Sequence, residues 1–190
     1  SDLKSYHVDK MRSCEAQGIR LLQFWDSELT DNFDLCVAMV RAITGMNAKV
    51  GARQCVLSDV PSAHAKAFMT ANHLAGFRPG AHIGLWRDGV LLAVATYGSS
   101  YFRKGCVELI RFASLQGVTV VGGFSKLIKA IPGTLISYSD NRYSRGGVYA
   151  ASGFRLDRDG GPTPWYTKDG ASLYHRSSII KKAHPELTQR

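Results

Sequence analysis

Apolar positions in the first fifty residues predict a small helical segment around one strand. Charged and apolar residues mix from 6 to 17 as in a helix that stops at Gly18, and the apolar run Ile19–Trp25 predicts a buried strand. From Phe33 to Ile43 apolar residues recur at a helical period. We therefore expect a helix-strand-helix appendage, and because one strand cannot form a sheet, it must pack on another part of the protein.

The remaining apolar runs predict a sheet flanked by helices. Two of them, 81–86 and 90–97, are joined by Arg87-Asp88-Gly89, and Asp-Gly is a strong signal for a tight antiparallel hairpin. Further strands are expected at 54–57, 107–114 and 134–139, and helices are expected to begin at Pro61, at Gly122-Gly123 and at Val148, before a final β-rich stretch that ends near Tyr174. The expected fold class is mixed, α/β or α+β, with a central mixed sheet and flanking helices.

The charge of the chain favours a polyanionic partner. Lys and Arg total 24 against 15 acidic residues, which gives a net charge of +9 in 190 residues. Such a surplus attracts nucleic acid, although an ordinary basic surface would also explain it. No apolar run approaches the roughly 18 residues that span a bilayer, and the N-terminus has no signal-peptide layout. We expect an intracellular protein with no membrane contact.

Neither cysteine nor histidine spacing predicts a metal site. Cys14, Cys36, Cys55 and Cys106 are far apart with no C-x-x-C pair, and the six histidines lack the spacing of metal ligands. Buried free thiols are therefore expected, with no metal bound by this chain alone.

Five residues are candidates for chemistry. Asp140 follows an apolar strand, where it could be an active carboxylate or merely the cap of a turn. Glu108 and Arg111 lie three apart on one strand and so face opposite sides unless a bulge intervenes, and the expected partner of Arg111 is Asp140 or Glu108. His73 could be a general base or a packing residue, and Tyr149 could donate a proton or belong to the core.

Basic and aromatic residues gather in the second half of the chain. Cations for phosphates together with aromatic rings for bases are typical of a nucleic-acid surface, although a solvated charged face is the alternative. The candidate contacts are Lys126, Arg142, Arg145, Arg155, Arg158, Trp165, Lys168 and Arg176.

The order of elements resembles the GNAT acyltransferase fold. The carrying residues are the glycine turn Gly122-Gly123-Phe124-Ser125 before a helix and the later segment 149–154, Tyr-Ala-Ala-Ser-Gly-Phe. The resemblance implies that Gly122 to Ser125 bind the pyrophosphate of acyl-CoA and that Tyr149 protonates a leaving thiolate. The first position of this glycine turn is Arg or Gln in the family, whereas this chain has Val120 there. We therefore expect no cofactor, with the bulk of Phe124 filling or distorting the phosphate cradle, although acyl-CoA is the cofactor that the resemblance allows.

A second resemblance covers most of the chain. The segments 71–76, 109–113, 121–127, 136–142 and 164–166 are similar to the C-terminal domain of phage homing endonucleases, and residues 6–29 look like the end of their very-short-patch-repair type nuclease module. The resemblance implies that residues 1–50 end a nuclease module and that residues 51–190 form a GNAT-like domain. It places the nuclease carboxylates, histidine and magnesium in a part that would precede Ser1.

These resemblances imply a protein that acts on DNA in the cytoplasm of a phage-infected bacterium. The central strands are also similar to Mom-type phage proteins, which modify DNA bases on a GNAT-like fold. The expected function is the DNA-recognition domain of a homing-endonuclease-like protein. The alternatives are a GNAT-like acyltransferase that modifies DNA bases, and a non-catalytic phage structural or partner-binding protein.

Overall fold

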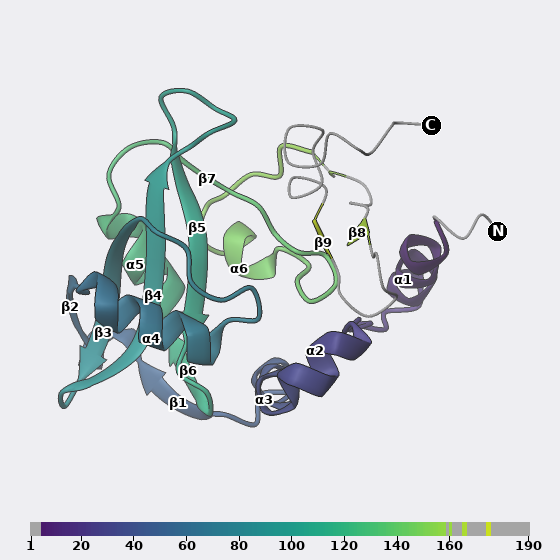
Figure 1. Ribbon diagram of the computed structural model, residues 1–190, viewed down its shortest axis with the longest axis horizontal. Coiled ribbons are helices and arrows are strands. Elements are labelled where there is room, and N and C mark those ends of the chain that lie inside the picture. Colours follow the sequence, from purple (N-terminus) through teal and green to yellow (C-terminus); the bar gives the residue numbers. More distant parts are fainter. Residues whose placement is uncertain (1–4, 159, 161–164, 167–173, 176–190) are drawn as a thin grey trace.

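The computed structural model describes residues 5–158, 160, 165–166 and 174–175. It has a mixed α/β fold, as expected, in which helices flank a central mixed sheet (Figure 1). The five strands of this sheet have the order β2-β3-β4-β5-β7. All neighbours are antiparallel except β5 and β7, which are parallel. The strands are β2 (Val56–Asp59), β3 (Ala81–Arg87), β4 (Val90–Ser99), β5 (Val107–Ser114) and β7 (Leu135–Ser137).

The hairpin between β3 and β4 follows its sequence signal. Asp88 and Gly89 have φ angles of 50° and 77°, and two consecutive positive φ angles are what the tightest hairpin turn needs. The predicted Asp-Gly hairpin is thus confirmed, and it joins two neighbouring antiparallel strands of the sheet.

Each face of the sheet is covered by a helix. Helix α4 (Ser62–Asn72) packs on one face, where Phe68 and Met69 join Val94 of β4 in a buried cluster. Helix α5 (Gly123–Ala130) packs on the other face, where Phe124 and Leu127 join the larger core. Side chains of a strand alternate between its two faces, so β3 and β4 supply both cores.

A bulge in β5 reverses this alternation. Thr96 pairs with Arg111 and the next residue of β4, Tyr97, pairs with Leu109, so Ile110 is an extra residue in β5. Leu109 belongs to the core beneath α5, whereas Ala113 belongs to the core beneath α4. The bulge therefore places Glu108 and Arg111 on the same face as Thr96, the face covered by α4.

Two short strands form a separate parallel pair that the sequence did not indicate. β1 (Ala48–Gly51) pairs with β6 (Val118–Val121), and the turn η1 (Ala52–Gln54) follows β1. The strand expected at 54–57 begins two residues later, as β2. The remaining short elements are α6 (Gly147–Ala150), β8 (Trp165–Tyr166) and β9 (Tyr174–His175), with β8 and β9 antiparallel.

The N-terminal segment differs from the expected helix-strand-helix. It contains α1 (Tyr6–Ala16), α2 (Asp26–Asp31) and α3 (Phe33–Ile43), and these helices lie to one side of the sheet (Figure 1). The strand expected at Ile19–Trp25 is wrong, because this stretch is irregular, and its residues 21–25 are half-buried. Its one backbone bond to a distant segment runs from Gln23 N–H to the Arg142 carbonyl, 3.1 Å away. No described strand lies beside it to form a ladder.

Among the described residues, no helix has the length and apolar composition that crossing a membrane requires.

Candidate nucleic-acid interface

The loop between β4 and β5 exposes large aromatic rings beside cations. Tyr101 is 88% exposed and Phe102 75% exposed, and their ring centroids are 5.1 Å apart. Phe102 also lies edge-on to Tyr138, 6.1 Å away, which is 58% exposed. Arg103 and Lys104 complete the loop and are exposed. We call these five residues the aromatic-basic loop region. Exposed rings beside exposed cations form a surface that suits both bases and phosphates.

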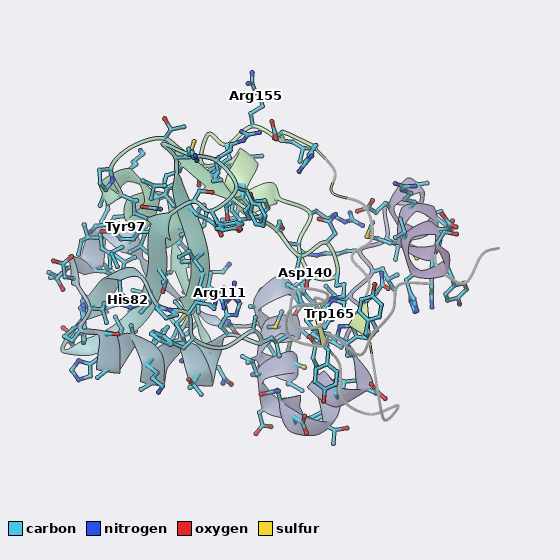
Figure 2. All side chains as sticks on the ribbon, turned by 45° about the horizontal axis from the view of Figure 1, so that its top comes forward. His82, Tyr97, Arg111, Asp140, Arg155 and Trp165 are labelled. Atoms are coloured by element: carbon cyan, nitrogen blue, oxygen red, sulfur yellow. The ribbon has the colours of Figure 1, made fainter. Side chains whose placement is uncertain are left out.

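The segment after α6 adds charge next to this region. Arg103 forms an ion pair with Asp157, with 2.6 Å between Nη2 and Oδ2, so the loop and this segment are in contact. Arg155 and Arg158, two of the predicted DNA contacts, are exposed in this segment, and Figure 2 shows Arg155 projecting away from the ribbon. Trp165 is 42% exposed in β8. Lys168 and Arg176 lie outside the described residues.

Arg142 holds the N-terminal helices onto the main body. Its guanidinium donates to both carboxylate oxygens of Glu28, at 3.0 and 3.1 Å, and to Asp140 at 2.9 Å. Tyr143 donates its hydroxyl to the same Glu28 carboxylate at 2.6 Å. Burial opposes the charge of Arg142, but the bonds from Asp140 and Glu28 outweigh it and raise its pKa. We call these four residues the Glu28 clamp.

Arg145 has a similar internal role. Its Nε lies 3.1 Å from a carboxylate oxygen of Glu15, and it also donates to the Ile19 carbonyl. Two of the predicted DNA contacts, Arg142 and Arg145, therefore have acidic partners within the protein, which leaves less of their charge for phosphate.

Asp140 is a capping residue of the turn after β7. Its Oδ1 accepts the Arg142 N–H at 3.0 Å, the pattern of an Asx turn. Strand β7 ends at Ser137 and is half-buried, so Asp140 does not sit directly at a buried strand end as expected. Of the two partners expected for Arg111, Asp140 bonds to Arg142 instead and Figure 2 shows it apart from Arg111, whereas Glu108 is the carboxylate whose charge acts on Arg111.

The glycine turn before α5 opens onto a basic hollow. Gly122 has a φ angle of 75°, and the start of α5 carries no side-chain cap. The hollow has a volume of about 740 Å³ and contains the cations Arg53 and Lys129. Lys126 also lines it but donates to the carbonyls of Ala52 and Cys55, at 2.9 and 2.7 Å. The other lining residues are Gly51, Ala52, Gln54, Val121, Gly122 and Ser125.

Phe124 points away from this hollow. It is 5% exposed in the core, with its ring 5.0 Å from Phe112 and 5.2 Å from Tyr149. The expectation that Phe124 fills the phosphate cradle is therefore wrong. Ser125, the last residue of the turn, is half-buried and shares a 2.7 Å hydrogen bond with Ser152.

Tyr149 belongs to an aromatic cluster where two strands part. β5 and β7 pair only as far as Leu109 and Ser137, and Ser137 Oγ lies 3.1 Å from the Leu109 carbonyl and 3.3 Å from the Tyr149 hydroxyl. The rings of Phe124 and Phe154 pack against Tyr149, and Phe112 packs against Phe124. This aromatic cluster lies beside the point where β5 and β7 stop pairing.

His73 and Arg111 meet on the other face of the sheet. Burial, and then the charge of Arg111, lower the pKa of His73 to about 4. Its Nδ1 accepts the Ala75 N–H at 3.1 Å, so the neutral ring carries its proton on Nε2. His73 at neutral pH is therefore a hydrogen-bond donor, which opposes its expected role as a base. Glu108 accepts a bond from Ser100 at 3.3 Å and adds a stabilising charge near Arg111.

Comparison with known proteins identifies no relative. The chain matches no protein-family model, and no curated protein or solved structure matches it.

Sequence reasoning missed the aromatic-basic loop region, although a signal was present. Tyr101-Phe102-Arg103-Lys104 lies between two predicted strands and is bounded by Ser100 and Gly105. A short connection between antiparallel strands runs over the surface, so aromatic residues within it must be exposed.

Proposed function

We propose that this protein binds duplex DNA, as the recognition domain of a homing-endonuclease-like protein. The aromatic-basic loop region carries the proposal, since three exposed rings and two cations lie together at one end of the sheet. The net charge of +9 supports a polyanionic partner. Soluble proteins rarely leave such rings in water without a partner, and an aromatic side chain can wedge between the base pairs of a duplex.

In this proposal the two kinds of side chain have different roles. Arg103, Lys104 and Arg155 neutralise phosphates, which gives an affinity that falls with salt. Tyr101 and Phe102 contact bases or base steps, which gives an affinity that depends little on salt. The Glu28 clamp holds the N-terminal helices on the same body, so a nuclease module joined to them would be oriented relative to the DNA.

The proposed acyltransferase alternative has weaker support. The hollow at the start of α5 suits a phosphate by its charge, but Tyr149, the proton donor that the resemblance implies, accepts a hydrogen bond from Ser137 and packs against Phe124 and Phe154. We therefore favour DNA recognition over acyl transfer as the function.

Paired variants at the loop test the proposal. Tyr101→Ala with Phe102→Ala should weaken duplex binding roughly tenfold or more without changing its salt dependence, because stacked rings contribute about 1–3 kcal/mol per base. Arg103→Gln with Lys104→Gln should weaken binding and reduce the salt slope by about 2, about one per phosphate contact. Fluorescence anisotropy with a labelled duplex measures both.

Two control variants alter exposed side chains elsewhere, one apolar and one cationic. Val56→Ala shortens an exposed apolar side chain of β2, and Lys66→Gln removes an exposed charge from α4. Both should bind the duplex like the unaltered protein. Equal losses of duplex affinity in the loop variants and in the controls would overturn the proposal.

A further inference from the structure

Three side chains form a polar row across the sheet, beneath the end of α4. His82 of β3 is in register with Thr96 of β4, and Thr96 is in register with Arg111 of β5. His82 Nδ1 and Thr96 Oγ1 are 3.0 Å apart, and both residues are buried. The bulge at Ile110 brings Arg111 into the row, since strict alternation would have placed it in the core beneath α5. Figure 2 shows His82 and Arg111 over the sheet.

Two nitrogens of this row have no partner in the described part of the chain. They are His82 Nε2 and Arg111 Nε, and His82 is only 6% exposed. Within the same residues the Arg111 guanidinium donates one hydrogen bond, from Nη1 to the adjacent Ile110 carbonyl at 2.9 Å. Leaving buried polar atoms unpaired costs free energy, so such a group in a folded protein calls for an explanation.

The surroundings of Arg111 carry excess positive charge. Burial, and then the charge of Arg78, lower the pKa of Arg111, and Glu108 only partly opposes them. Arg78 is exposed and has no hydrogen bond or ion pair among the described residues. His73 adds a neutral Nε2–H donor beside Arg111. Arg78, Arg111 and His73 thus offer hydrogen-bond donors, and the two arginines are cationic.

We infer that His73, Arg78 and Arg111 form a binding site for one phosphate group, backed by the His82–Thr96 pair. The two guanidinium groups outnumber the one nearby carboxylate, Glu108, so the cluster keeps a net positive charge that suits an anion, and their planar forks suit the oxygens of a phosphate. The phosphate can come from a free phosphate or nucleotide, or from the backbone of DNA. This inference goes beyond the proposed function, since it holds whether or not the protein binds DNA.

Titration with inorganic phosphate at constant ionic strength tests the site. The probes are the NMR signals of the imidazole groups of His73 and His82 and of Arg111 Nε–H. We expect saturable shifts at these groups in the unaltered protein. Arg78→Gln should weaken phosphate binding roughly tenfold, because a hydrogen bond to a charged group is lost. Arg78 is exposed, so this variant keeps the fold, and Arg111→Lys is the second variant.

Arg53→Gln is the matched control, because it removes an arginine from the hollow at the start of α5. It should leave the phosphate shifts unchanged. Loss of phosphate binding in Arg53→Gln but not in Arg78→Gln would place the anion in the hollow and overturn the inference.

A second arm distinguishes the source of the phosphate. If inorganic phosphate gives no saturable shift but Arg78→Gln weakens duplex binding, the group bound is a backbone phosphate of DNA. If phosphate gives no shift and Arg78→Gln leaves duplex binding unchanged, the inference is wrong. Failure of the loop variants alone would overturn the proposed function and leave this site standing.

Discussion

Glu28→Gln should detach the N-terminal helices from the main body. The Glu28 carboxylate accepts two bonds from Arg142, one from Tyr143 at 2.6 Å and one from Trp25 N–H at 2.9 Å. The side chains of Arg142 and Glu28 are 23% and 17% exposed, so water screens the pair only in part. Glutamine keeps the size of the side chain but removes its charge and turns an N–H₂ group toward the guanidinium.

The expected loss follows from these contacts. Breaking a buried ion pair costs about 3–5 kcal/mol when the remaining charge has no other partner. Asp140 stays bonded to Arg142 at 2.9 Å, which reduces the penalty. We therefore expect Glu28→Gln to lower the free energy of attachment of the helices by about 2–3 kcal/mol.

Hydrogen exchange of the backbone amides measures this effect by region. Protection should fall in α1, α2 and α3 and stay unchanged in the strands of the central sheet. Asp31→Asn is the control, because Asp31 is an exposed acidic residue on the same helix α2. If the exchange rates of α1, α2 and α3 were equal in Glu28→Gln and Asp31→Asn, the Glu28 clamp would not be what holds these helices on the main body.

Three further predictions concern stability and cofactor binding. Because the folded protein lowers the pKa of His73 from 6.5 to about 4, stability should be complete above pH 6.5 and fall as pH drops toward 4, by up to about 3 kcal/mol. His73→Gln should flatten this part of a urea-unfolding series, and an unchanged pH profile would contradict the shift. Gly123→Val should lower the free energy of unfolding, measured with urea, by about 1–3 kcal/mol, because even a Cβ at this position would lie 2.9 Å from Val120 Cβ. Gly147→Val, whose side chain would enter open space, should lower it by less than about 1 kcal/mol. Calorimetry with acetyl-CoA should show no saturable binding, and clear binding that Gly123→Val abolishes would favour the transferase instead.

The strands of the central sheet were the most predictable part of the fold. The Asp88-Gly89 turn has a local signature, and β3, β4 and β5 are long enough for their apolar runs to stand out. β1 and β6 have four residues each and pair across about seventy positions of sequence, so no local pattern identifies them. Ile19–Trp25 has the apolar composition of a strand but no strand beside it, so composition alone gave the wrong structure there.

The site residues were predictable by type more than by role. Arg142 and Arg145 were expected to meet DNA, but Glu28 and Glu15 lie more than a hundred residues away in sequence, and only the fold brings them together. Arg111 was expected to share a face with Glu108 only if a bulge intervened, and the bulge is present. Its neighbour Arg78 gave no signal in the sequence, because it lies in an irregular segment.

The salt dependence of duplex affinity is the most direct test of DNA binding. The affinity of the purified protein for a labelled duplex is measured at several salt concentrations, and the logarithm of the binding constant is plotted against that of salt. A protein whose cations displace condensed counterions should give a steep negative slope, of about 0.9 per phosphate contacted. An affinity that stays constant when salt is raised severalfold would contradict the proposal that this basic protein recognises DNA.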